Sequence, residues 1–228
     1  MQLPLLMGHR GAAALAPENT LAGVRAAKAA GVDWVELDVL STADAVPVVH
    51  HDQTLARCFD DPRVLSAASA DTLPAGLPRL DQMLTLLNEL DMGVNLELKT
   101  YDDTPLDALV AGVAEVWQRC RPKGFLSSFS SPALEKAQEA LPEVARAFIT
   151  TPFNQRRIDE ALRLGCFAVN VYHRVIGAKR VARAKADGLQ VGVWTVNTVT
   201  EAMRCRQAGV DCVITDDPAL LLSHANDL

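Results

Sequence analysis

The sequence contains few cysteines and no long apolar run. Five cysteines are scattered over 228 residues without a Cys-x-x-Cys pair, so neither a disulfide framework nor a structural zinc site is indicated. Unpaired thiols are typical of a reducing compartment, and we expect a cytoplasmic location. No stretch reaches the ~18 uninterrupted apolar residues of a membrane span, and the chain does not open on a basic segment followed by an apolar one. We therefore expect an unexported protein without stable membrane insertion.

Positive charge is also scarce. The chain has 22 lysines and arginines against 28 acidic residues, a net charge of −6, and no basic run interleaved with aromatic residues. This composition argues against nucleic acid as a partner. An anionic ligand would have to be attracted by a few local cations. The oligomeric state is left open by these features.

Nucleotide-binding signatures are missing as well, since the chain has neither a G-x-G-x-x-G nor a Walker A pattern. What is present is an ordinary globular composition, with 49% hydrophobic and 22% charged residues. The length suits one α/β barrel, and we expect a single domain over residues 1–228.

Strand and helix patterns alternate along the whole chain. Short apolar segments predict strands at 3–8, 34–39, 46–49, 94–99, 124–129, 145–150, 167–172, 191–196 and 212–215. Capped, periodic segments predict helices at 21–30, 80–90, 105–121, 132–141, 155–164, 175–187, 199–208 and from 218 onward. The expected caps include Asn19 or Thr20 for the first helix, the Ser130-Ser131 pair for the helix at 132–141 and Asp217 for the last. Eight such steps favour an all-parallel sheet closed into a (β/α)8 TIM barrel over a doubly wound open sheet, with a short insertion at 54–78 after the second strand.

The second predicted strand carries two acids on one face. Because side chains alternate along a strand, Glu36 and Asp38 point one way while the valines and Leu37 point the other. Like charges placed side by side are costly unless something positive lies between them, and a divalent cation is the usual solution. The alternative is a solvated strand face with two harmless acids.

The strand at 94–99 repeats this arrangement, with Glu97 and Lys99 on one face and leucines on the other. Catalytic groups of such barrels lie at the carboxyl ends of the strands. Three carboxylates and one lysine on two strands therefore predict a polar site at that mouth.

Two histidines are expected at the same mouth. His9 closes the first strand and His51 follows the second, and an imidazole titrates near neutral pH, so the pair can serve as general acid and base. A lone histidine would more simply be a buried or surface residue. His50 has the opposite strand parity from His51, so only one of them should face the site. Asp52 either orients its neighbour or starts the loop.

A carboxylate-bound hard cation prefers oxygen ligands such as phosphate, and Arg10 with Lys99 would add positive charge for the same group. This combination suggests phosphodiester cleavage. Taken singly, Arg10 could instead pair with Glu18, and Lys99 could be a solvated strand end.

Eight motifs in order support one resemblance. They are His9-Arg10-Gly11, PENT at 17–20, VELD at 35–38, PVVHHD at 47–52, LELK at 96–99, SSF at 127–129, VWTVN at 193–197 and GVDCVITDDP at 209–218. Together the chain resembles the bacterial glycerophosphodiester phosphodiesterases.

The resemblance implies a TIM barrel that hydrolyses glycerophosphodiesters, such as glycerophosphocholine or glycerophosphoethanolamine, to sn-glycerol 3-phosphate and an alcohol. It implies a divalent cation, Mg²⁺ or Ca²⁺. By matching positions, the implied metal ligands are Glu36, Asp38 and Glu97, the acid and base pair is His9 and His51, the phosphate contacts are Arg10 and Lys99, and the apolar wall against glycerol is Trp194 with Phe129. For Trp194, packing within the barrel is the competing interpretation.

Two departures from the family pattern stand out. Ala45 occupies a turn position where the family commonly has glycine, so the turn lacks a residue free to take positive φ. The segment between 52 and 78 is short, which leaves substrate preference open. The competing hypotheses are a phospholipase-like enzyme acting on intact lipid head groups and a non-catalytic phosphate or sugar binder, which would be expected to lose one of the acids or histidines.

Overall fold

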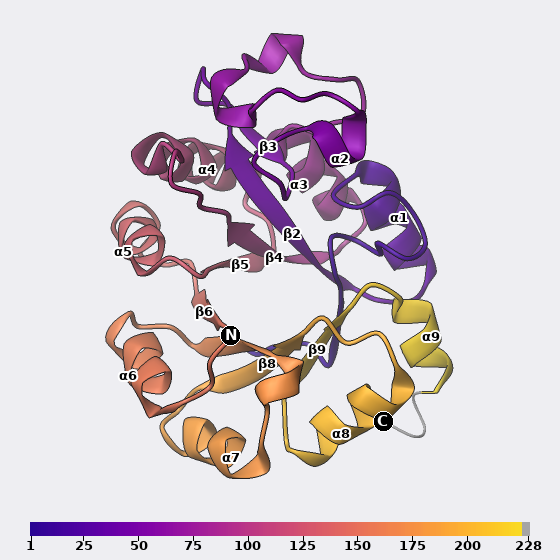
Figure 1. The fold of residues 1–228 in the computed structure, drawn as a ribbon, viewed down its shortest axis with the longest axis vertical. Coiled ribbons are helices and arrows are strands. Elements are labelled where there is room, and N and C mark those ends of the chain that lie inside the picture. Colours follow the sequence, from indigo (N-terminus) through magenta and orange to yellow (C-terminus); the bar gives the residue numbers. More distant parts are fainter. Residues whose placement is uncertain (225–228) are drawn as a thin grey trace.

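The protein is described by a computed structural model covering residues 1–224. Eight parallel strands form a closed barrel with helices packed around it (Figure 1). The strands are β1 (Leu6–Gly8), β2 (Trp34–Ser41), β3 (Pro47–Val49), β4 (Gly93–Leu98), β5 (Gly124–Ser128), β6 (Arg146–Thr150), β7 (Ala168–Tyr172), β8 (Gln190–Trp194) and β9 (Cys212–Thr215). The helices are α1 (Leu21–Ala29), α2 (Ala56–Phe59), α3 (Leu80–Glu89), α4 (Leu106–Cys120), α5 (Ser131–Ala140), α6 (Gln155–Arg163), α7 (Ala178–Ala186), α8 (Val199–Gln207) and α9 (Pro218–Ser223). Three short 3₁₀ turns complete the description: η1 (Leu65–Ala67), η2 (Ala70–Thr72) and η3 (His173–Val175).

The predicted TIM barrel is confirmed. Neighbouring strands run β1-β2-β4-β5-β6-β7-β8-β9, and β1 closes the ring by pairing in parallel with β2 on one side and β9 on the other. The expectation that every strand is parallel is wrong for β3. This strand pairs antiparallel with β2, Val39 opposite Val49, so the short run after the second strand is the return arm of a hairpin.

The hairpin turn explains the reversal. The amide of Ala45 donates to the carbonyl of Thr42, and Ala45 has a φ of 61°. The turn therefore takes the left-handed conformation at the position where glycine is missing, and an alanine bears the steric cost.

Helix starts follow the predicted caps. The hydroxyl of Thr20 accepts from the amide of Gly23 at the start of α1, and the side chain of Asp217 accepts from the amide of Leu220 at the start of α9. Ser130 caps α5 in the same way. These side chains satisfy amides that have no partner inside a helix.

Strand alternation creates two cores. Outward side chains such as Val35 and Leu37 pack under the helices in a large apolar layer. Inward side chains such as Met7, Phe125 and Cys212 fill the barrel near the amino ends of the strands. The apolar plug gives way to polar residues toward the carboxyl ends, and this gradient places the polar chemistry at one mouth.

The chain between β3 and α3 forms the expected short insertion, at the top of Figure 1. It has a small core of its own, in which Leu55, Leu65 and Leu77 pack with Leu40 and Val48. Among the described residues, no helix combines the length and apolar character that crossing a membrane requires.

Candidate active site

Three buried carboxylates converge at the barrel mouth. Glu36 and Asp38 project from β2 and Glu97 from β4, where Asp38 and Glu97 are register partners. One oxygen of each lies within 4.8 Å of the others. The parity argument therefore places these side chains correctly, and the set of hard oxygen donors suits a divalent cation.

Burial and mutual repulsion make it unfavourable for all three carboxylates of this cluster to be ionised together. Burial, reinforced by the charge of Asp38, raises the pKa of Glu36 to about 8. Burial likewise raises the pKa of Glu97 to about 7. Asp38 differs, because the charges of Lys99 and Arg10 overcome its burial and lower its pKa to about 2. A bound cation would relieve the cluster.

Two cations border the acids. The Nζ of Lys99 lies 2.8 Å from Glu97 Oε1 and 3.2 Å from Asp38 Oδ1, so Lys99 is no solvated strand end. Arg10 makes both contacts that the sequence left open. Its Nε lies 3.3 Å from Asp38 Oδ2, and its guanidinium donates to Glu18 Oε1 at 2.8 Å.

His9 stands at one side of the cluster. Its Nδ1 lies 2.6 Å from Asp216 Oδ1, and its Nε2 lies 3.8 Å from Glu36 Oε2. Because a carboxylate accepts hydrogen bonds, Nδ1 carries the proton and Nε2 faces the acids. Burial lowers the pKa of His9, but the bond to Asp216 and the charge of Glu36 outweigh it and leave that pKa raised.

Sequence reasoning assigned no role to Asp216. Its second oxygen accepts from the amide of Asn197 at 2.6 Å, so the carboxylate is fixed on both sides. The only sequence signal was the DDP motif at the last strand, where Asp217 was recognised as a helix cap.

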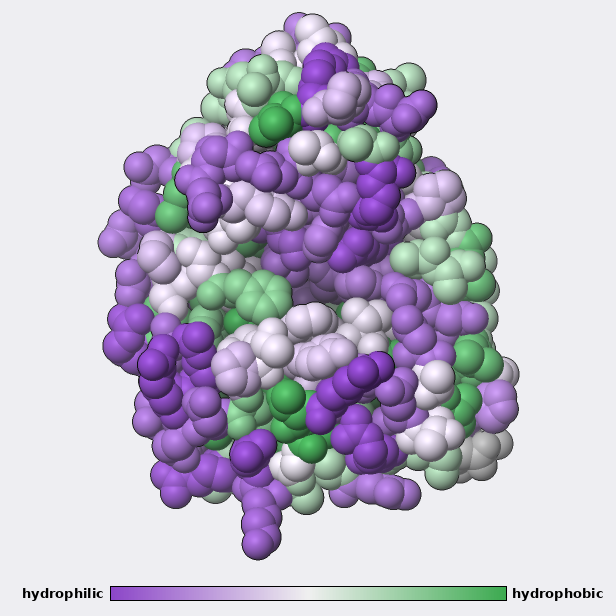
Figure 2. Space-filling view, in the orientation of Figure 1, coloured by the Kyte–Doolittle hydropathy of each residue, from purple (hydrophilic) through white to green (hydrophobic). Residues whose placement is uncertain are grey.

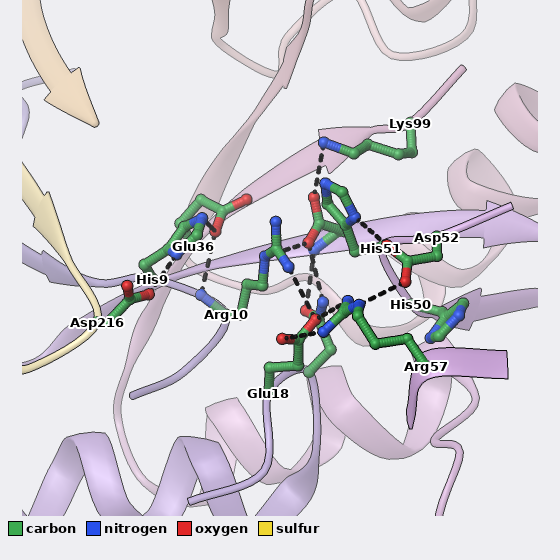
Figure 3. A network of polar contacts seen from close by, with 12 residues as sticks. His9, Arg10, Glu18, Glu36, His50, His51, Asp52, Arg57, Lys99 and Asp216 are labelled. Atoms are coloured by element: carbon green, nitrogen blue, oxygen red, sulfur yellow. Dashed lines mark hydrogen bonds and ion pairs between the residues drawn. The ribbon is translucent and has the colours of Figure 1, made fainter. Parts of the chain in front are cut away.

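His51 stands at the other side, and its Nδ1 lies 2.6 Å from Asp52 Oδ1. His50 turns away and contacts the carbonyl of Thr54 through Nε2, 3.0 Å away, as its parity predicts (Figure 3). Asp52 thus orients its neighbour rather than only starting the loop. Burial lowers the pKa of His51.

Arg57, another residue the sequence did not single out as functional, ties the insertion to the site. It donates to Asp52 Oδ2 at 2.6 Å and to both oxygens of Glu18, at 2.6 and 2.8 Å. Figure 3 shows the resulting chain of contacts from His51 through Arg57 to Arg10. The loop after β1 and the insertion are thereby linked beside the acids.

Asn19 is the other missed residue. The sequence offered it as a helix cap, but Thr20 takes that place, and Asn19 adopts a φ of 56°. Its Nδ2 donates to Asp38 Oδ2 at 2.9 Å and its Oδ1 accepts from the Asp38 amide. Asn19 thus holds the central carboxylate.

An aromatic wall completes the mouth. The rings of Phe129 and Trp194 meet edge to face with centroids 5.6 Å apart, and Lys99 lies over the Phe129 ring at 5.9 Å. Phe129 is 43% exposed, and Trp194 lines the cavity while packing on Tyr172. Trp194 therefore both lines the cavity and packs within the barrel, and its contact with glycerol stays a prediction.

Several of these groups border one cavity of about 230 Å³. Its lining includes His9, His51, Arg10, Glu36 and Glu97 beside the aromatic wall. Figure 2 shows a hollow near the middle of the face, bordered largely by hydrophilic residues. The arrangement can bind a phosphate group and move protons on either side of it.

The comparisons with known proteins decide the family. The model of the glycerophosphoryl diester phosphodiesterase family matches residues 9–220. The chain belongs to this family. It is therefore an enzyme, a phosphoric diester hydrolase, and the hypothesis of a non-catalytic binder is set aside.

Individual relatives of this phosphodiesterase cover nearly its whole length. It is 27% identical to the glycerophosphodiester phosphodiesterase of Caldanaerobacter subterraneus subsp. tengcongensis over 96% of each chain. A phosphodiesterase of Oleispira antarctica, solved with the product sn-glycerol-3-phosphate, superposes with a TM-score of 0.92 at 29% identity, covering 98% of this chain and 97% of that one. The Thermotoga maritima enzyme, 22% identical with a TM-score of 0.81 over 98% and 99% of the two chains, shares the fold.

Proposed function

We propose that the chain hydrolyses glycerophosphodiesters such as glycerophosphocholine and glycerophosphoethanolamine to sn-glycerol 3-phosphate and an alcohol, with the help of a divalent cation. One observation carries the proposal. Two imidazoles, each fixed through Nδ1 by a carboxylate, line the same cavity as Glu36 and Glu97, two members of the cluster of three buried acids. The product found in the Oleispira antarctica structure is consistent with this substrate class.

Glu36, Asp38 and Glu97 would hold the cation, Mg²⁺ or Ca²⁺. Three buried carboxylates, with one oxygen of each within 4.8 Å of the others, could all reach one ion. The pKa values of the two glutamates are raised, so a nearby positive charge would favour their ionised forms. When bound, such an ion polarises a phosphate oxygen as a Lewis acid.

The protein's own residues would do the rest. Arg10 and Lys99 bind phosphate oxygens and offset the charge that develops on them. One of His9 and His51 takes the proton from the attacking oxygen through Nε2, and the other returns a proton to the leaving alkoxide. Phe129 and Trp194 cover the glycerol carbons and exclude water from that side.

The test is release of glycerol 3-phosphate from glycerophosphocholine, with and without EDTA, by the wild type and by His9→Ala and His51→Ala variants. We expect EDTA to abolish turnover, and each variant to lose about 10²- to 10⁴-fold in kcat because a proton-transfer group is missing. His50→Asn is the matched control, since His50 faces away from the cavity. Turnover that persists both under EDTA and without His9 would refute the proposal.

We propose soluble diesters rather than intact lipids as substrates, and the cytoplasm as the site of action. The cavity of about 230 Å³ matches a head group more closely than acyl chains. The five cysteines are all free, which suits a reducing compartment. Co-sedimentation with phospholipid vesicles, accompanied by release of phosphorylated head groups, would instead favour the phospholipase-like alternative, and cell fractionation tests the location.

A further inference from the structure

Two buried amide side chains line the cavity below the acids and are not used by the proposed reaction. Asn95 projects inward from β4 and Asn170 from β7. They are 0% and 1% exposed. Among residues 1–224, neither the Oδ1 nor the Nδ2 of either side chain has a hydrogen-bond partner.

Such atoms call for an explanation, because buried polar groups in proteins almost always find partners. Their neighbours in the cavity lining include Ile149 and Ile214, which offer no hydrogen bonds from their side chains. Leucine would fill a similar volume in this apolar plug at no polar cost. The two carboxamides are therefore placed to bind something that enters the cavity.

The barrel wall makes room for one of them. A Cβ on Gly192 would lie 2.4 Å from Asn170 Oδ1. The carboxamide therefore occupies space that the side chain of any residue other than glycine at position 192 would fill. Asn170 and Gly192 are register partners on adjacent strands. The Asn170 amide is thus seated against the wall.

The chemistry of the two amides matches hydroxyl groups. Each carboxamide offers donors and an acceptor, and each alcohol hydroxyl both donates and accepts. A cationic head group would fit poorly, because Arg10 and Lys99 line the same cavity and Lys99 already covers the Phe129 ring. An uncharged polyol suits both the amides and the aromatic wall.

We propose that Asn95 and Asn170 form a subsite for the hydroxyl groups of the glycerol arm. This inference rests on the proposed function and adds to it which arm of the diester enters the barrel. The glycerol arm lies inward on the two amides, and the alcohol arm projects from the mouth.

The test compares the binding of sn-glycerol 3-phosphate with that of n-propyl phosphate, which has the same carbon chain without hydroxyls, by calorimetry in the presence of Mg²⁺. We expect the wild type to bind glycerol 3-phosphate at least about tenfold more tightly, because a site built for hydroxyls rejects an analogue that lacks them. Asn95→Leu and Asn170→Leu should each reduce this ratio to about threefold or less, chiefly by weakening glycerol 3-phosphate.

Gly192→Ala provides a variant in which Asn170 itself is kept. Its new Cβ displaces only the end of the Asn170 side chain, so the barrel should fold and the ratio should fall as it does in Asn170→Leu. Ser127→Ala is the matched control. Its hydroxyl is also buried and unpartnered within residues 1–224 but does not line the cavity, and the ratio should stay at the wild-type value.

A wild type that binds both phosphates equally, or variants that weaken both ligands to the same extent, would overturn the subsite. If Asn170→Leu shows no cooperative melt and is therefore unfolded, the affinity ratio of the Gly192→Ala variant decides whether Asn170 belongs to the subsite. Failure of the proposed function is a separate result. A wild type that discriminates between the two phosphates but releases no glycerol 3-phosphate from glycerophosphocholine keeps the subsite and refutes the hydrolysis.

Discussion

At the scale of single residues, the pairing of His9 with Asp216 determines what the imidazole can do. The carboxylate fixes the proton on Nδ1 and leaves Nε2 for the cavity. Asn197 holds the other oxygen of Asp216, so the pair has little freedom to rotate. Asp216 is therefore a positioning residue for His9.

We expect Asp216→Asn to lower kcat for glycerophosphocholine about 10- to 1,000-fold with little change in KM, because the imidazole loses the partner that fixes its tautomer. Steady-state kinetics provides the measurement. Asp217→Asn is the control, since asparagine also caps a helix and Asp217 caps α9. An unchanged kcat in Asp216→Asn would contradict the role.

Strand parity predicted where the acids, Lys99 and the two adjacent histidines point, because a strand has a fixed two-residue period. It could not predict Asp216 as the partner of His9. That contact joins residues 207 positions apart, and only the closure of the barrel brings them together. The place of Asn170 in the cavity could not be predicted either, because residues from several strands form that cavity.

The charge of the acid cluster leads to a prediction about metal ions. We expect Mg²⁺ or Ca²⁺ at 100 times its dissociation constant to stabilise the wild type by about 2.7 kcal/mol, or roughly 5–10 °C in Tm. Glu97→Gln should lose most of this shift because it removes one anionic ligand. Glu115→Gln, on the exposed face of α4, should keep it. Thermal melts with EDTA as the reference give the measurement, and an equal shift in both variants would place the ion elsewhere.

At the scale of elements, the hairpin between β2 and β3 shows what a local pattern leaves undetermined. The apolar run at 46–49 correctly indicated a strand, but apolar character does not encode direction. The turn decides it, and Ala45 at a φ of 61° is the strained point of that turn. The helices were placed more accurately because their caps are local.

Ala45→Gly should stabilise the protein by about 1 kcal/mol, since glycine takes the left-handed conformation without the steric cost that alanine bears. Urea denaturation measures the change. Ala43→Gly, in the same turn but without a positive φ, should instead be neutral or slightly destabilising. Equal effects of the two substitutions would show that Ala45 carries no strain.

At the scale of the whole molecule, the ring depends on β1, a strand of three residues that pairs on both sides. Its last residue is Gly8, where a Cβ would lie 1.8 Å from the carbonyl oxygen of Gly11. The chain can turn back tightly after β1 only because this position has no side chain. This turn delivers His9 and Arg10 to the mouth.

Gly8→Ala should therefore destabilise the fold by about 3 kcal/mol or more, because a backbone atom has to move. Gly177→Ala meets nothing within 4 Å and should cost less than about 1 kcal/mol. Chemical denaturation of both variants gives the comparison. A Gly8→Ala protein as stable as Gly177→Ala would show that the turn can relax.

The pairing of β1 with β9 also has a consequence for synthesis on the ribosome. While residues after β8 are still inside the exit tunnel, the nascent chain already holds the three clustered acids but lacks the carboxylate that fixes His9. We therefore expect full activity only after the final strand docks. Prematurely terminated chains are expected to be far less active than the complete chain, so the rise in the rate of product formation can be used to time when the fold is completed.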